Sequence, residues 1–293
     1  MRRAQTPGFR WSGTRVLITG GGSGIGRLMA LEAARRGAEV IVWDLSEPAG
    51  RGTADAITER GGTARAYGVD VTDRQAVGRT AEETGPVDVV INNAGVVSGA
   101  RLLDIPAESI ERTVNVNILA LYWVTRAFLG GMIARGHGSV VTIASAAGLT
   151  GVARQTDYSA SKWAAIGFTE SLRNELRADG HPVNTLVVCP FYIDTGMFAG
   201  VRSRFPRLLP ILDPDEVTLK VIDAIEAGRR QLVLPPLVRA VPVLRALPVA
   251  AFDRILDVLG VNQTMDHFTG RPGGAQPPAK GGSTSTRESS PTG

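Results

Sequence analysis

A tyrosine and a lysine four positions apart are the residues whose types and spacing most strongly suggest catalysis. Tyr158 and Lys162 fall in a stretch with helical periodicity, where such residues share one face. An ammonium beside a phenol favours the phenolate, so we expect Lys162 to lower the pKa of Tyr158 and make it a proton carrier. Ser145, at the end of an expected strand, adds a hydroxyl that can hydrogen-bond a substrate oxygen. The alternative for the Tyr–Lys pair is an ordinary helix face.

The lysine content of the chain favours the catalytic interpretation. The sequence has 32 Lys and Arg residues, and reading along it finds only three lysines, Lys162, Lys220 and Lys280. Arginine is the ordinary basic residue of this chain, but a guanidinium cannot replace a compact ammonium. The occurrence of one of the three lysines at this spacing therefore indicates that position 162 requires lysine.

A glycine-rich segment predicts a phosphate-binding turn. TGGGSGIG at 19–26 follows the apolar run RVLIT at 15–19 and leads into a helical pattern. Glycines let the backbone approach a pyrophosphate closely, and the start of the helix offers free N–H groups. A tight connection without a ligand is the alternative, but the position after the first strand favours a cofactor. The expected contacts are Gly20, Ser23, Gly24, Ile25 and Gly26.

Two aspartates stand at the ends of expected strands. Asp44 lies 18 residues after Gly26, where a carboxylate accepts hydrogen bonds from an adenosine ribose and repels a 2′-phosphate. Neither Ser23 nor Leu45 brings a positive charge to offset that repulsion, so the sequence favours NAD over NADP. The alternative is a helix N-cap or a solvent-facing acid. Asp70 is the analogous candidate beside the adenine ring, with a turn-forming aspartate as its alternative.

The elements that must position these residues alternate along the chain. We expect strands at 15–19, 39–44, 64–69, 87–91, 139–144 and 183–188. Between them we expect helices at 24–36, 107–135, 155–178 and 213–227, together with one helix that ends at about residue 60 and one that ends at about residue 84. Apolar runs of this kind form parallel strands that are covered by helices on both faces. The expected fold is therefore a single doubly wound α/β Rossmann domain, with a parallel sheet of about seven strands.

Composition divides the chain into four expected parts. These are an N-terminal lead at 1–13, a catalytic domain at 14–230, an apolar and basic arm at 231–269, and a disordered tail at 270–293. Four prolines interrupt the arm, so no continuous helix is expected there. The tail is rich in Gly, Pro, Ser and Thr and has almost nothing to bury.

Composition also excludes several classes of protein. Hydrophobic residues make up 43% of the chain, without an uninterrupted apolar run long enough for a membrane span. The single cysteine, Cys189, has no partner within the chain, and no signal peptide is recognisable, so we expect a cytoplasmic protein. The three histidines are far apart in the sequence, which gives no metal-ligand spacing.

The net charge of +4 does not indicate a nucleic-acid partner. Residues 16–199 contain 16 basic residues against 19 acidic ones, so the basic excess lies at the two ends of the chain. A nucleic-acid binder more often has a concentrated basic stripe.

Together, the motifs resemble the short-chain dehydrogenase/reductase family over about residues 13–200. The matching segments are TGGGSGIG at 19–26, DV at 70–71, NNAG at 92–95, Ser145, and YSASK at 158–162. The resemblance implies an NAD site that also includes Val71, Asn93, Ala94, Gly95, Tyr158, Lys162, Pro190, Ile193 and Thr195. Phe191 stands where the family usually has a glycine after Pro190.

The resemblance also implies a mechanism. Tyr158 exchanges a proton with an alcohol or carbonyl oxygen that Ser145 holds, Lys162 binds the nicotinamide ribose, and the nicotinamide carries the hydride. The family's catalytic asparagine is either Asn115 or Asn117, and the register of the following helix selects Asn117 as the anchor of a proton-relay water.

Several details are similar to the retinol and hydroxysteroid dehydrogenase branch, including IASAAG at 143–148 and CPFYIDTG at 189–196. The expected activity is NAD(H)-dependent oxidoreduction at a CH–OH group of a lipophilic retinoid, steroid or long-chain alcohol, by a homodimer or homotetramer. The alternatives are a non-catalytic nucleotide sensor on the same fold and a reductase of small polar carbonyls.

The arm suggests a role at the substrate entrance. Residues 229–254, which begin two residues before the arm, contain five arginines and one acid among many apolar residues. We hypothesise that residues 229–269 cap the entrance and contact an anionic membrane surface. Packing on a sister subunit is the alternative.

Overall fold

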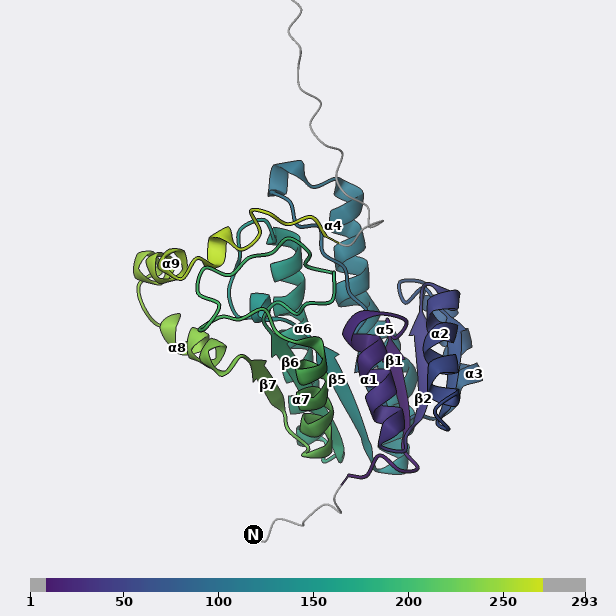
Figure 1. The fold of residues 1–293 in the computed structure, drawn as a ribbon. Coiled ribbons are helices and arrows are strands. Elements are labelled where there is room, and N and C mark those ends of the chain that lie inside the picture. The colour runs from purple at the N-terminus through teal and green to yellow at the C-terminus, as the bar shows by residue number, and fades with distance from the viewer. Residues whose placement is uncertain (1–8, 271–293) are drawn as a thin grey trace, which may run out of the picture.

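The computed structural model describes residues 9–270, and its centre is a parallel sheet (Figure 1). The seven strands lie in the order β3-β2-β1-β4-β5-β6-β7. They are β1 (Arg15–Thr19), β2 (Glu39–Asp44), β3 (Thr63–Gly68), β4 (Val89–Asn92), β5 (Gly138–Ile143), β6 (Val183–Pro190) and β7 (Gln231–Leu234). The order reverses between β1 and β4, and such a reversal leaves a crevice at the carboxyl ends of the strands. The predicted doubly wound sheet is confirmed.

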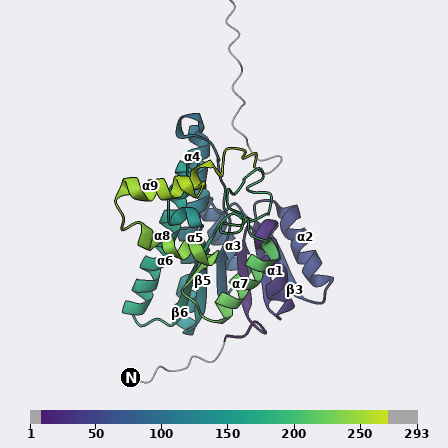
Figure 2. The ribbon, with the colours of Figure 1, turned by 60° about the vertical axis from the view of Figure 1, so that its left-hand side comes forward.

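Helices cover both faces of the sheet (Figure 2). They are α1 (Gly24–Arg35), α2 (Glu47–Thr58), α3 (Arg74–Thr84), α4 (Ala107–Val114), α5 (Ala120–Arg135), α6 (Thr156–Ala178), α7 (Pro214–Glu226), α8 (Val241–Leu244) and α9 (Val249–Val258). One apolar core joins the sheet to α1, α2 and α7, and a second joins it to α3, α5 and α6. The strand β1 contributes to both, because successive side chains of a strand point to opposite faces. Val16 and Ile18 lie in the first core and Leu17 in the second, all fully buried.

The region expected as one long helix, 107–135, is interrupted. A π-helical segment, Asn115–Leu119, separates α4 from α5. The wider turn of a π-helix changes the direction in which side chains point, and hydrophobic periodicity does not reveal it. By length and composition Ala107–Arg135 is apolar enough to cross a membrane. Within the domain, however, Val124, Phe128 and Met132 are buried against the sheet, so α5 is a core helix.

The expected boundary between domain and arm at residue 230 is four residues too early. Gln231–Leu234 forms β7, which pairs in parallel with β6 and completes the sheet. Because Pro235 and Pro236 follow directly, the sequence pattern did not indicate this short strand. Beyond β7, a proline stands at the start of three helical pieces: Pro236 begins the 3₁₀ turn Pro236–Ala240, Pro242 is the second residue of α8, and Pro248 is the N-cap of α9. The expected tail at 270–293 lies outside the described residues, except Gly270.

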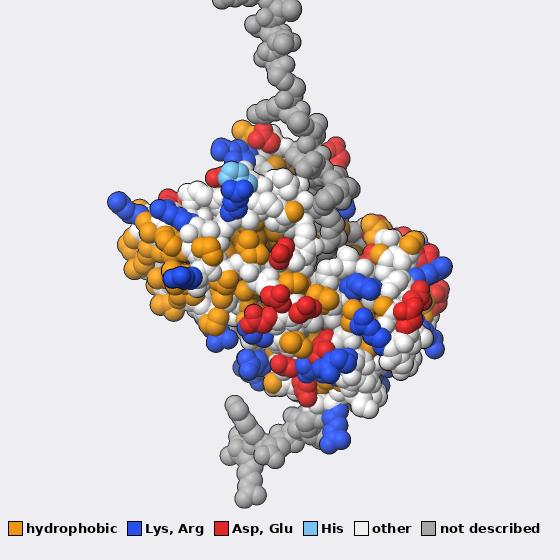
Figure 3. All heavy atoms as spheres, viewed as in Figure 1, with side chains coloured by type: hydrophobic (Ala, Val, Ile, Leu, Met, Phe, Trp, Pro, Cys, Tyr) orange, Lys and Arg blue, Asp and Glu red, His pale blue; other side chains and the backbone are white. Residues whose placement is uncertain are grey.

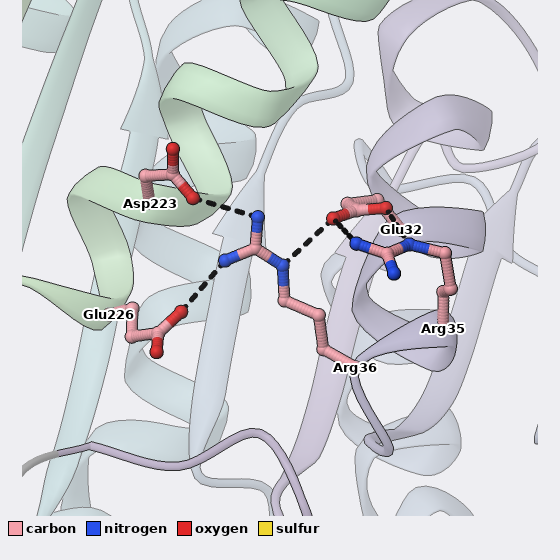
Figure 4. Close-up of polar contacts among 5 residues, drawn as sticks. All are labelled: Glu32, Arg35, Arg36, Asp223 and Glu226. Atoms are coloured by element: carbon pink, nitrogen blue, oxygen red, sulfur yellow. Dashed lines mark hydrogen bonds and ion pairs between the residues drawn. The ribbon is translucent and has the colours of Figure 1, made fainter.

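An ion cluster connects α1 to α7 on the surface (Figure 4). Arg36, at the C-cap of α1, donates hydrogen bonds to Glu32 at 2.8 Å, Asp223 at 2.7 Å and Glu226 at 2.7 Å. Its side chain is only 18% exposed. The cluster therefore ties a helix beside the crevice to one that comes more than 180 residues later in the chain.

Candidate active site

The glycine-rich turn after β1 is shaped by close backbone approaches. Gly20 and Gly24 adopt positive φ angles of 63° and 54°, which glycine allows without strain. A Cβ on Gly26 would lie 2.2 Å from the carbonyl oxygen of Gly20, so no larger residue fits there. The helix α1 begins at Gly24 and presents its first N–H groups toward this turn. The turn has the bare backbone and helix N-terminus that a pyrophosphate needs.

The NNAG segment after β4 fixes that turn in place. Asn93 donates from Nδ2 to the carbonyl oxygens of Thr19 at 2.9 Å and Gly20 at 3.1 Å. The Thr19 hydroxyl in turn accepts from the backbone N–H groups of Asn93 and Ala94. Asn92 donates to Thr125 of α5 at 3.1 Å. These bonds hold the ends of β1 and β4 together at the crevice.

Asp44 has the position expected of a ribose-binding acid. It ends β2 and accepts hydrogen bonds from the N–H groups of Gly22 at 2.8 Å and Ser46 at 2.9 Å. These bonds aim the carboxylate into the space beside the glycine turn, and the side chain lines the cavity described below. Ser46, not Asp44, caps α2. The helix N-cap alternative for Asp44 is therefore wrong.

Asp70 is exposed and makes a local turn. Its Oδ1 accepts from the N–H and the hydroxyl of Thr72, at 2.9 and 2.7 Å. The turn-forming alternative is thus confirmed, while Asp70 and Val71 also lie on the cavity wall.

One cavity of about 710 Å³ joins these features to the proposed catalytic residues. Nearly all of the predicted residues line it: Gly20, Ser23, Gly24, Ile25, Gly26, Asp44, Asp70, Val71, Asn93, Ala94, Gly95, Ser145, Tyr158, Lys162, Pro190, Ile193 and Thr195. The cavity runs from the glycine turn to the apolar side chains of the arm. Its first part fits a dinucleotide, because the glycine turn and the N-terminus of α1 lie on its wall.

Ser145, Tyr158 and Lys162 meet at the middle of the cavity. Tyr158 and Lys162 lie one turn apart on α6, with Lys162 Nζ 5.5 Å from the centre of the tyrosine ring. Lys162 Nζ donates to the carbonyl oxygen of Ile143 at 2.9 Å. Ser145 follows β5, caps the 3₁₀ turn Ala146–Gly148, and is hydrogen-bonded to Tyr158. Both Tyr158 and Lys162 are 5% exposed, so they are largely removed from bulk water.

The pKa values differ from the expectation. Burial raises the pKa of Tyr158 above its ordinary value, although the hydrogen bond to Ser145 lowers it. Burial lowers the pKa of Lys162 to about 8, against the opposing effect of Cys189. The prediction that Lys162 lowers the pKa of Tyr158 is therefore wrong for the protein alone, because burial of the phenol disfavours its charged form.

The choice of Asn117 over Asn115 agrees with the geometry. Asn117 is buried in the π-helical segment, whereas Asn115 is exposed. The Asn117 amide donates to the carbonyl oxygen of Val96 and to Ser161, and its Oδ1 accepts from the N–H of Val96. Unlike the other predicted residues, Asn117 does not line the cavity. It lies behind Gly95, where a Cβ would be 3.4 Å from Asn117 Oδ1 and 3.6 Å from Lys162 Nζ.

Beyond the catalytic residues the cavity wall is aromatic and apolar. Phe198 packs edge-on against Tyr158 at 5.7 Å and against Tyr192 at 5.0 Å between ring centres. Phe191, in place of the family's usual glycine, stacks edge-on against Tyr192 at 4.7 Å. Burial raises the pKa of Tyr192 to about 12, so its hydroxyl keeps its proton. This part of the cavity suits a lipophilic molecule.

Sequence reasoning named no individual wall residues from the arm. Those that line the cavity are Leu237, Val238, Ala240, Val241, Leu244, Leu256, Leu259 and Val261. Gln155 and the loop residues Leu208 and Leu209 complete this end. The high content of apolar residues indicated a role at the substrate entrance, but it did not show which side chains of the arm face the cavity. Among residues 9–270 no group of three His, Cys, Asp or Glu side chains is placed to hold a metal ion.

Comparison with known proteins agrees with this geometry. A family model described as short chain dehydrogenase matches residues 14–205. Epidermal retinol dehydrogenase 2 of Mus musculus is 43% identical over 267 residues, which cover 89% of this chain and 86% of the relative.

Two solved structures share the fold. One is a short chain dehydrogenase/reductase from Burkholderia phymatum in complex with NAD, with a TM-score of 0.74 and 27% identity over 81% of this chain and 94% of that one. The other is a metagenomic short-chain oxidoreductase in complex with NADP, with a TM-score of 0.64 and 27% identity over 76% and 96%. The glycine turn, the Ser–Tyr–Lys group and these matches lead to one conclusion: the chain belongs to the short-chain dehydrogenase/reductase family.

Proposed function

We propose that the chain oxidises or reduces a lipophilic alcohol or carbonyl compound with NAD as its cofactor. As a member of its family it is an NAD(P)-dependent oxidoreductase that acts on CH–OH groups. The observation that carries the proposal is the continuity of one cavity, from a glycine turn, past Tyr158, to an apolar wall. The names of the relatives, retinol dehydrogenases, support a retinoid-like substrate.

The residues divide the chemistry among them. A bound nicotinamide accepts or supplies the hydride. Tyr158 exchanges the proton of the reacting oxygen, and Ser145 holds that oxygen by a hydrogen bond. Lys162 binds the nicotinamide ribose and places its ammonium near the phenol. Asn117 supports the loop at Gly95 and Val96 through its hydrogen bonds and anchors the water of a proton relay.

The preference for NAD rests on Asp44. Its carboxylate lines the cavity beside Gly22, and a 2′-phosphate there would meet negative charge. Asp44→Ala should raise the kcat/KM ratio of NADP to NAD about tenfold, with Asp55→Ala, an exposed residue of α2, as the matched control. A wild-type enzyme that uses NADP better than NAD would contradict the preference.

The experiment for the function itself follows NADH formation in the presence of NAD and a long-chain primary alcohol. We expect turnover by the wild type and a loss of about a thousandfold in Tyr158→Phe, since general acid–base catalysis contributes about that factor. NADH titration of the variant tests that the cofactor site persists. Normal turnover by Tyr158→Phe would contradict the role of the phenol.

A second observation favours contact with a membrane. The arm exposes a cluster of apolar side chains at Leu237, Val243, Leu247, Val249 and Val258, and Val243 and Val249 are each 75% exposed. Figure 3 shows this apolar surface over α8 and α9, with basic side chains at its margin. Exposed Arg239 and Arg254 supply positive charge there. We propose that this face contacts an anionic lipid surface, from which the substrate reaches the cavity.

Co-sedimentation with phosphatidylserine vesicles tests this contact. The double variant Val243→Asp and Val249→Asp should lose binding to the vesicles. The control, Leu103→Asp, changes a 97% exposed residue of the 3₁₀ turn Leu102–Asp104, outside the arm, and should retain binding. Equal binding by both variants would contradict the proposal and leave packing on a sister subunit as the role of the arm. A homodimer or homotetramer and a cytoplasmic location, peripheral to a membrane, stay predictions.

A further inference from the structure

A chain of buried polar groups crosses the apolar end of the cavity. Gln155 Nε2 lies 3.2 Å from the Tyr192 hydroxyl, which lies 2.9 Å from Thr264 Oγ1. Gln155 is 1% exposed, Thr264 is 3% exposed and Tyr192 is 7% exposed. The three residues come from the start of α6, the loop after β6 and the C-terminal segment, so this network joins parts of the chain that are far apart in sequence.

The direction of the hydrogen bonds fixes the orientation of the Gln155 amide. The Thr264 hydroxyl donates its single proton to the carbonyl oxygen of Val261 at 2.8 Å. The Tyr192 hydroxyl must therefore donate to Thr264, and its oxygen accepts from the remaining neighbour, Gln155 Nε2. Met265 Sδ, at 3.0 Å, is a second and weaker acceptor for the same amide nitrogen. The oxygen of the Gln155 amide thus lies at the free end of the network.

That oxygen is a buried acceptor without a donor. Gln155 Oε1 has no hydrogen-bond partner among the described residues. Leaving a buried acceptor unpaired is unfavourable, by an amount similar to the loss of a hydrogen bond. Gln155 lines the cavity and is the N-cap residue of α6, three positions before Tyr158. A ligand in the cavity is therefore well placed to supply the missing donor.

The reacting hydroxyl cannot be that donor. Its one proton passes to Tyr158 in the oxidation, and a reacting carbonyl has no proton to donate. We propose that Gln155 is a specificity-determining residue, whose amide oxygen accepts a hydrogen bond from a second hydroxyl of a lipophilic substrate. This inference rests on the proposed function, and it narrows the substrate class to lipophilic diols or hydroxycarbonyl compounds. An apolar wall that contains one hydrogen-bond acceptor favours a substrate with a hydroxyl at the matching position over a substrate that lacks it.

The test compares substrates of equal length. The kcat/KM values of the wild type are measured for a long-chain primary alcohol and for the series of diols of the same chain length, with NAD. We expect one diol of the series to exceed the simple alcohol about tenfold, the effect of one hydrogen bond. Gln155→Met removes the acceptor and should bring this ratio to about one. Thr264→Val removes the acceptor that fixes the direction of the Tyr192 hydroxyl, and with it the orientation of the Gln155 amide, so this variant should weaken the preference too.

Each outcome tests either the role of Gln155 or the proposed function. A wild-type ratio of about one for every diol overturns the role of Gln155 and needs no variant to fold. An unchanged preference in Gln155→Met overturns it as well, provided that thermal melting shows a folded variant. No turnover of any alcohol would instead contradict the proposed function, and the inference with it.

Discussion

The two ends of the cavity recognise their ligands in different ways. At the cofactor end, glycine backbone, the N-terminus of α1 and the hydrogen bonds of Asn93 to Thr19 and Gly20 form the wall. At the substrate end, side chains form it: Phe198 and Tyr192 above Tyr158, and the apolar residues of the arm. The first end uses backbone geometry in which larger side chains do not fit, whereas the second uses the shapes of individual side chains.

This difference predicts that substitutions at the two ends weaken the binding of different ligands. A change in the glycine turn should weaken cofactor binding, and a change in the aromatic wall should weaken substrate binding alone. Tyr158 and Lys162 lie where the two ends meet, so changes there should affect the chemical step.

Among changes to the cavity wall, the largest effect is expected at the glycine turn. In Gly26→Ala the new Cβ would lie 2.2 Å from the Gly20 oxygen and 2.5 Å from Asn93 Nδ2, so the turn must shift. We expect the Kd for NADH, from fluorescence titration, to rise about a hundredfold, because the backbone N–H groups no longer converge on the pyrophosphate.

The control for this change is Gly130→Ala in the middle of α5, where a Cβ meets nothing. Its NADH affinity should equal that of the wild type, since alanine is favoured over glycine in a helix. Wild-type affinity in Gly26→Ala would show that the turn does not hold the cofactor.

A smaller effect is expected at the aromatic wall. Phe198→Ala removes a ring that packs on both Tyr158 and Tyr192. The KM for a long-chain alcohol should rise about tenfold, as expected from losing part of a buried aromatic contact, while the KM for NAD stays unchanged. Phe205→Ala, in the same loop but not on the cavity wall, should change neither value. A parallel rise in both KM values for Phe198→Ala would contradict the separation of the two ends.

The surface ion cluster should affect stability and not the site. Arg36→Ala leaves three carboxylates, including Asp223 and Glu226 of α7, without their shared cation. The free energy of unfolding should fall by about 1 kcal/mol, because the side chain is mostly but not fully shielded from solvent. Chemical denaturation measures this change, and the KM values for NAD and alcohol should stay as in the wild type. A changed KM would mean that the α1–α7 contact shapes the cavity.

A pH dependence of stability is expected at the meeting point of the two ends. The pKa of Lys162 is about 8 in the folded chain, below the ordinary value of 10.5. Between these values the unfolded chain binds more protons than the folded one, so stability from this group rises with pH. Relative to Lys162→Met, the free energy of unfolding of the wild type should rise by about 1 kcal/mol per pH unit from pH 8 upward. A flat difference would place the Lys162 pKa near its ordinary value.

The sequence predicted the cofactor end better than the substrate end, for a physical reason. The glycine turn and Asp44 are local consequences of a strand that leads into a helix, so their spacing is visible in the chain. The Tyr158–Lys162 pair is also local, being one helical turn. The strand β7, the contacts of Gln155 with Thr264, and the burial that raises the pKa of Tyr158 all depend on segments that meet only after folding. The π-helical segment depends in the same way on the packing of Asn117.

The central claim is that the substrate end selects a lipophilic alcohol, and the most direct measurement is its specificity. The kcat/KM values for a long-chain primary alcohol and for a short polyol are compared at saturating NAD. Since each buried methylene contributes about 0.8 kcal/mol, we predict a preference of a thousandfold or more for the long-chain alcohol. Equal values, or a preference for the polyol, would contradict the account.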